Sequence, residues 1–171
     1  MTKRWSILFA MVIVAGVAAH RLHGQTPAPR PASTVQQLMQ GLLFPNANVI
    51  FAAEGDDPAT LPRDAKPSAS TNPLTGLYGG WQAVENSGLA LAESADLLSL
   101  KDRLCANGKA VPVGEAQWKT AVQELRASAD ATVVASRARS QEKISEAAAR
   151  LTDSCSSCHR IYRRAENHCS R

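Results

Sequence analysis

Two cysteines and a histidine lie close together near the C-terminal end of the chain, in the stretch SCSSCHRIYRR (residues 154–164). Cys155 and Cys158 are separated by two serines, and His159 follows the second cysteine directly. A CxxC pair of this kind can form a disulfide, act as a thiol redox site or supply half of a zinc site. Each of these chemistries makes a different demand on the rest of the chain.

The rest of the chain meets none of those three demands well, although none is eliminated. A disulfide within the motif would close a very short loop and stabilise little. A thiol redox site is expected beside a βαβ pattern, whereas this motif follows a helical segment. Zinc would need a second pair of ligands, and Cys105, His168 and Cys169 are the candidates.

The histidine next to the second cysteine favours a fourth chemistry, the covalent attachment of haem. A c-type haem takes two thiols, which add to its vinyl groups, and an imidazole that reaches the iron between them. The CxxCH stretch supplies all three groups from neighbouring residues. We therefore expect one haem c, with Cys155 and Cys158 as thioethers and His159 as the proximal iron ligand.

Helical periodicity dominates the chain and determines how this motif is presented. Apolar residues recur at spacings of three and four in two long segments: Trp118, Val122, Leu125, Ala129 and Val133, then Ile144, Ala148, Leu151, Cys155, His159 and Tyr162. Such stripes are typical of the buried side of a bundle helix. Because Cys155 and His159 continue the second stripe, the motif is expected to face the bundle interior.

Two earlier helices complete the expected fold. The first starts near Ser33 or Thr34, both suitable N-caps, and runs toward Ala53, with Pro45 expected to kink or break it. The second runs over residues 80–104, and a tight turn at residues 139–141 joins the last two helices. We predict an all-α fold, an antiparallel four-helix bundle that holds the haem covalently.

The two ends of the chain divide into segments of different composition. Residues 1–24 carry Lys3 and Arg4 before an uncharged apolar stretch, the layout of a cleaved secretory signal peptide, with an uncleaved anchor as the alternative. Residues 25–32 read as a flexible linker and residues 33–171 as the haem domain, with a long crossover loop at residues 54–79. These boundaries predict export to the periplasm and no stable membrane insertion after cleavage.

The charge balance gives no support for nucleic-acid binding. Residues 1–24 hold three basic side chains and no acidic one, so their removal lowers the formal net charge from +4 to +1. Nucleic-acid binding would need a clustered basic face. The sequence also lacks a Ser-His-Asp set or a phosphate loop, and we do not expect an enzyme.

The stretch CSSCHRIYRR at the end of an α-helical exported chain resembles the class II c-type cytochromes, the cytochrome c′ family. Members are four-helix bundles with haem at a C-terminal CxxCHxxYR segment, so the resemblance is specific at residues 155–163. It implies that Arg163 lies near the proximal face of the haem. The alternative is a solvated charge favoured by the helix dipole. The loop after the first helix is longer than in typical members, and the segment LFPNANVIF (residues 43–51) departs from their pattern.

The same resemblance implies that the sixth iron position decides the function. Low-spin members present a methionine from the first helix in a segment similar to QQLMQG, and the match falls on Met39. Its alternative is a gap-filling core methionine. Asn46 and Asn48 either line a distal pocket or are solvated turn residues.

The remaining cysteines, Cys105 and Cys169, are predicted to form a disulfide, because the end of the second helix and the C-terminus can meet in an up-and-down bundle. Two free thiols are the alternative.

The leading hypothesis is a one-electron carrier that meets other redox proteins transiently. The alternatives are a five-coordinate haem protein that binds nitric oxide or carbon monoxide, and a disulfide-stapled helical binding module without haem. The resemblance also implies that the bundle can pair as a homodimer.

Overall fold

The computed structural model describes residues 31–164 and 167–169. The expected signal peptide and most of the expected linker lie outside these residues. The helical elements, in chain order, are α2 (Val35–Leu38), η1 (Met39–Leu43), α3 (Phe44–Gly55), η2 (Pro67–Ala69), α4 (Trp81–Leu98), α5 (Ala116–Ala138) and α6 (Gln141–Tyr162). Two-residue strands β1 (Arg163–Arg164) and β2 (Asn167–His168) follow α6 as an antiparallel hairpin.

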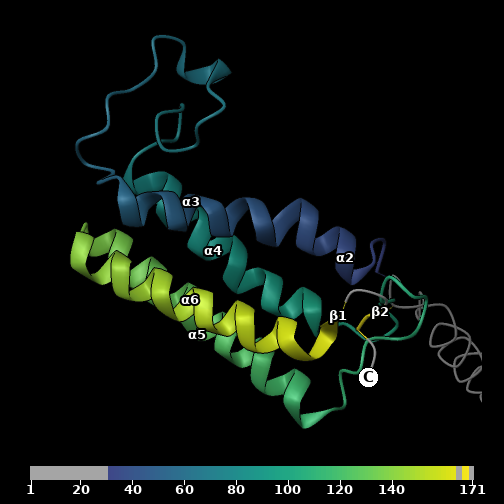
Figure 1. The fold of residues 1–171 in the computed structure, drawn as a ribbon. Coiled ribbons are helices and arrows are strands. Elements are labelled where there is room, and N and C mark those ends of the chain that lie inside the picture. The colour runs from purple at the N-terminus through teal and green to yellow at the C-terminus, as the bar shows by residue number, and fades with distance from the viewer. Residues whose placement is uncertain (1–30, 165–166, 170–171) are drawn as a thin grey trace, which may run out of the picture. The chain divides into compact units, whose positions relative to one another are not determined.

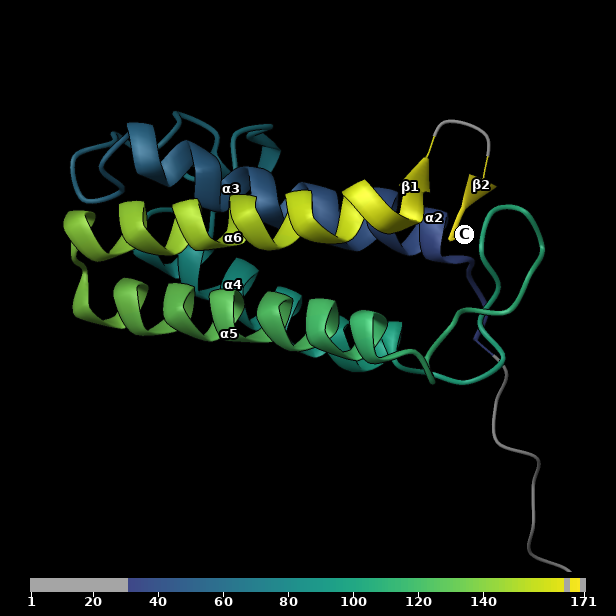
Figure 2. The ribbon, with the colours of Figure 1, turned by 60° about the horizontal axis from the view of Figure 1, so that its bottom comes forward.

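The long helices form a four-helix bundle within the described residues, as predicted (Figure 1). The first rod consists of α2, η1 and α3 in direct succession, and it packs against both α4 and α6. Helix α5 packs between α4 and α6, so each helix has two neighbours around a shared core. Figure 2 shows α5 and α6 side by side along the bundle. Among the described residues, no helix is both long and apolar enough to cross a membrane.

Local hydrogen bonds explain where two of the helices begin. Thr34 is the N-cap of α2, and it forms a reciprocal capping box with Gln37 through bonds of 2.9 and 3.2 Å. The predicted tight turn before α6 is confirmed. Arg139 takes the left-handed conformation that ends α5, and the Ser140 hydroxyl accepts a bond from the Lys143 N–H at the start of α6.

The second helix is shorter than predicted, because α4 ends at Leu98 and not at Leu104. The Arg103 Nε donates to the Leu97 carbonyl at 3.0 Å and so satisfies an acceptor in the last turn. Asp102 has a φ of 64°, which a continuing right-handed helix cannot accommodate. Cys105 therefore lies within the connection between α4 and α5, not at the end of a helix.

Pro45 does not break the first helix, so the expectation of a break at that residue is wrong, and the helix is instead interrupted by a π-helical turn just before it. Pro45 lies in the first turn of α3, directly after the five-residue π-helical turn η1. In this wider turn the Phe44 N–H donates to the Met39 carbonyl five residues back. The irregularity thus falls on the segment that carries Met39.

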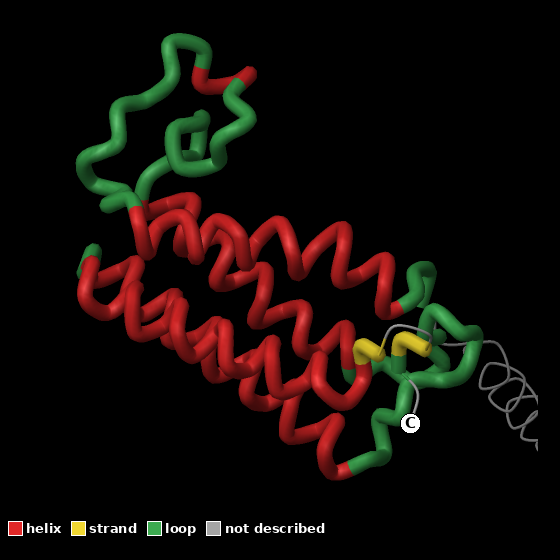
Figure 3. Tube along the Cα trace, in the orientation of Figure 1, coloured by secondary structure: helices red, strands yellow, loops and turns green. Residues whose placement is uncertain are grey.

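The crossover between α3 and α4 spans residues 56–80 and contains the short helix η2 (Figure 3). Backbone hydrogen bonds tie it together, from Leu77 to Pro67 and from Gly80 to Leu74. It lies at the end of the bundle opposite the strands (Figures 1 and 2). The chemical motif is therefore at the far end from this loop.

Candidate haem-binding site

An apolar cavity of about 310 Å³ lies in the half of the bundle that carries the CxxCH motif. It is within the range of small-ligand sites, roughly 300–1,000 Å³. Its walls come from the first rod, α4, α5 and α6, and most of them are aliphatic or aromatic: Val35, Leu43, Phe44, Ala47, Phe51, Leu91, Leu98, Trp118, Ala121, Val122, Leu125, Leu151 and Tyr162.

Cys155, Cys158 and His159 all line this cavity from the last two turns of α6. Residues three and four apart share one helix face, which is why the CxxCH spacing brings both sulfurs and the imidazole to the same side. All three side chains are partly buried. The structure thus presents the motif toward the bundle interior, as the periodicity predicts.

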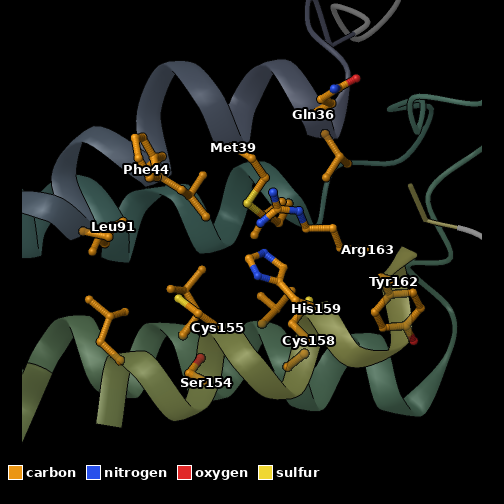
Figure 4. Close-up of a pocket in the computed structure, with 18 of the residues that line it drawn as sticks. Gln36, Met39, Phe44, Leu91, Ser154, Cys155, Cys158, His159, Tyr162 and Arg163 are labelled. Carbon is orange, nitrogen blue, oxygen red and sulfur yellow. The ribbon is translucent and has the colours of Figure 1, made fainter. Parts of the chain in front are cut away.

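Met39 lies across the cavity from this motif, on η1. Figure 4 shows its side chain directed toward the His159 ring from the opposite wall. Met39 is partly buried, and it both packs against the core cluster and lines the cavity. A thioether and an imidazole therefore face one another between apolar walls.

Arg163 is the C-cap of α6, and its backbone N–H donates to the His159 carbonyl. Its side chain is exposed yet lines the cavity. In Figure 4 the guanidinium extends back toward Met39 and lies, in this view, between the Met39 sulfur and the His159 ring. A positive charge therefore stands next to the candidate iron ligands and not only at the tip of a solvated helix.

Burial raises the pKa of both motif cysteines above its ordinary value. The Cys158 pKa rises to about 11, chiefly because desolvation disfavours the thiolate, with smaller contributions from the Cys155 thiolate and the Glu124 carboxylate. Burial also raises the Cys155 pKa, against a backbone hydrogen bond that lowers it. Both groups are protonated thiols at neutral pH, unlike the low-pKa cysteines of thiol redox sites.

Cys105 and Cys169 lie at disulfide-bonding distance, with their Cα atoms 5.4 Å apart, as the sequence predicts. Cys169 also lines the cavity, and its N–H donates to the Tyr162 carbonyl at 2.6 Å. The Tyr162 ring meets Trp118 edge to face at 4.9 Å, and its hydroxyl donates to Glu115 at 3.0 Å. The end of α6 is thereby tied to the loop before α5.

Several residues of this region differ from expectation or were missed by sequence reasoning. Asn46 does not line the cavity: its Nδ2 donates to the Leu42 carbonyl at 2.7 Å, and Asn48 is exposed. His168 belongs to β2, but its side chain is not described. The wall contributed by Phe44 and Phe51 was missed, although the four-residue spacing of Val35, Met39, Leu43, Ala47 and Phe51 signals it.

Within the described residues, no group of three or more His, Cys, Asp or Glu side chains has the geometry to hold a metal ion. Comparisons with family models, curated proteins and solved structures found no match. The chemistry of the donor set does fit a c-type haem. Two thiols and an imidazole share one helix face, a thioether lies opposite, and the walls between them are apolar.

Proposed function

We propose that this chain is an exported c-type cytochrome that carries single electrons with one haem c. The observation that carries the proposal is the arrangement across the cavity: Met39 and His159 face each other, and Cys155 and Cys158 border the same space. This pairing of a soft sulfur and an imidazole, together with two thiols, suits a covalently held, six-coordinate haem.

Different residues of the chain would hold the haem and set its reduction potential. Cys155 and Cys158 would form the thioethers, His159 would supply the proximal nitrogen, and Met39 would supply a sulfur that favours the ferrous state. When bound, the haem supplies the Fe(III)/Fe(II) couple. The apolar walls would limit the contact of the bound group with water, which would raise the cost of the additional charge on ferric iron. No side chain is required as acid, base or nucleophile, so the proposed role is not enzymatic.

A second candidate function, the capture of nitric oxide or carbon monoxide at an open sixth position, rests on the place of Met39. This residue lies on the only π-helical turn of the described residues and is only partly buried. A methionine that turned away from the cavity would leave the position opposite His159 to a small gas. The two functions therefore differ in the conformation of one side chain.

The proposed carrier would act in the periplasm and meet other redox proteins through weak, transient interfaces, as electron-transfer encounters do. The candidate homodimer belongs to the same proposal. Neither nucleic acid nor a membrane is among the proposed partners.

Visible spectra of protein exported from a haem-attaching host test the proposal. We expect sharp low-spin bands, a sulfur-to-iron charge-transfer band in the oxidised form and no shift under carbon monoxide after reduction. Met39→Leu preserves the apolar volume but cannot ligate iron. It should lose the charge-transfer band and admit carbon monoxide.

The outcomes separate the three hypotheses. Broad high-spin bands that shift under carbon monoxide, unaltered by Met39→Leu, would favour gas binding over electron transfer. Colourless protein from the same host would favour a helical module without haem. Cys155→Ser/Cys158→Ser is the control that should remove covalent haem in either haem hypothesis.

A further inference from the structure

The cavity wall on the first rod is built from residues spaced by four, and a straight α-helix does not keep such residues on one face. Each α-helical residue turns about 100°, so a step of four overshoots a full turn by about 40°. Met39 and Ala47 would be about 80° apart, and Val35 and Phe51 about 160° apart. All four residues nevertheless line the same cavity.

The π-helical turn η1 accounts for this alignment. A π-turn accommodates one extra residue, so the flanking helices turn relative to one another as if one residue were missing, about 100° less. The offset between Met39 and Ala47 then falls to about 20°, and that between Val35 and Phe51 to about 60°. The turn directs Met39 to the cavity while Val35 and Leu38 stay buried.

Hydrogen bonds at the π-turn, and not a close contact at its glycine, are the features that bear on its stability. The Phe44 N–H bonds to the Met39 carbonyl, and Pro45 has no N–H with which to continue an α-helical pattern. The Asn46 Nδ2 donates to the carbonyl of Leu42, which lies within the π-turn, at 2.7 Å. A Cβ on Gly41 would meet nothing within 4 Å, so no close contact requires that glycine.

We propose that Asn46 is a positioning residue of the iron site: through its bond to Leu42 it stabilises the π-turn that aligns Met39 with His159. This inference rests on the proposed function, because it assigns the means by which the sixth ligand is held. It also gives the segment LFPNANVIF a role, since Pro45 cannot donate to the Gly41 carbonyl as a regular α-helix requires and Asn46 adds a side-chain bond to the neighbouring carbonyl of Leu42. Without that bond the turn relaxes and Met39 leaves the iron more often.

The experiment compares three variants of the exported holoprotein. Asn46→Ala removes the side-chain donor. Asn46→Ser restores a short donor that can reach the carbonyl four residues back. Asn48→Ala is the matched control, an exposed asparagine on the same helix. The readouts are the sulfur-to-iron band, the fraction of reduced protein that binds carbon monoxide, and amide hydrogen exchange at Phe44, which reports the π-turn without reference to the iron.

For Asn46→Ala we expect about a fivefold rise in the ratio of methionine-free to methionine-bound iron, the change that corresponds to one neutral hydrogen bond of about 1 kcal/mol. Exchange at Phe44 should accelerate, Asn46→Ser should reverse both effects, and Asn48→Ala should show neither.

Two results would overturn the inference while the proposed function stands. One is an Asn46→Ala protein that matches Asn48→Ala in band intensity and carbon monoxide binding. The other is a loss that Asn46→Ser does not reverse, which would indicate general destabilisation. Absence of the sulfur-to-iron band in the unsubstituted protein would instead refute methionine ligation itself, and the inference with it.

Discussion

The two ends of the bundle are built from the same helices but are stabilised differently. At the crossover-loop end, Ile50, Val84 and Ile144 are fully buried. There α4 approaches α5 so closely that a Cβ on Gly88 would lie 2.9 Å from a methyl of Val133. At the other end the same helices line a cavity of about 310 Å³. The candidate ligand side chains that border this cavity are only partly buried: Met39, Cys155, Cys158 and His159.

Cross-links take the place of packing around the cavity. Interiors are normally close-packed, and an apolar void sacrifices dispersion contacts. The cavity end compensates with the Cys105–Cys169 pair, a bond of 3.2 Å from the Trp118 Nε1 to the Leu98 carbonyl, and a bond of 2.6 Å from buried Arg103 to the Ser33 carbonyl. The comparison indicates that a helical bundle can keep a cavity in place of core side chains when the rim of that cavity is held together by covalent and polar links.

Removal of the disulfide should have the largest effect on stability. It spans 64 residues, for which the chain-entropy estimate is roughly 4 kcal/mol. We expect Cys105→Ala/Cys169→Ala to lower the free energy of unfolding of the holoprotein by about this amount, measured by denaturant titration. Non-reducing peptide mapping of the unsubstituted protein is the check: recovery of both cysteines alkylated would show that this end is not cross-linked.

The packed end should respond to loss of side-chain volume without any change at the proposed iron site. Ile144 is fully buried, so Ile144→Ala should cost about 3 kcal/mol in the free energy of unfolding. Its visible spectrum should match that of the unsubstituted protein. Val134, 60% exposed on α5, is the control, and Val134→Ala should change stability by less than about 0.5 kcal/mol. A spectral change in Ile144→Ala would mean that the two ends are coupled and the comparison fails.

The regular parts of the bundle were predictable because local rules determine them. The stripe from Ile144 to Tyr162 has helical period, so it predicted both the helix α6 and the direction of the CxxCH motif. The Thr34 cap follows from residue types within a few positions. These features require no knowledge of distant contacts.

Features that depend on competing hydrogen bonds were not predictable in the same way. Pro45 indicated a disturbance of the first helix, but neither its form as a π-turn nor the bond from the Asn46 side chain to Leu42 within that turn could be read from the apolar periodicity. The end of α4 at Leu98 depends on Arg103, which also bonds Ser33 from far away in the sequence. In both places tertiary or side-chain donors overrode the periodic signal.

The smallest expected effect is a pH dependence of the free energy of unfolding that arises from the thiols at the cavity. It applies to haem-free protein in which Cys155 and Cys158 are reduced. The Cys158 pKa is raised from an ordinary value of 9.0 to about 11, mainly by burial. Between these pH values the folded state binds more protons than the unfolded state. The stabilisation of the folded state that comes from the protonated Cys158 thiol is therefore complete below about pH 9 and is lost as the pH rises toward 11.

Alkylation rates measured against pH, in the folded protein and in urea, test this sign. Because only the thiolate reacts, the folded profile for Cys158 should be displaced to higher pH than the unfolded one. The free energy of unfolding should fall across the same interval, and Cys158→Ser should show a weaker decline. Coincident folded and unfolded profiles would mean that Cys158 is fully solvated, and the cavity end would then be an open groove instead of an apolar enclosure.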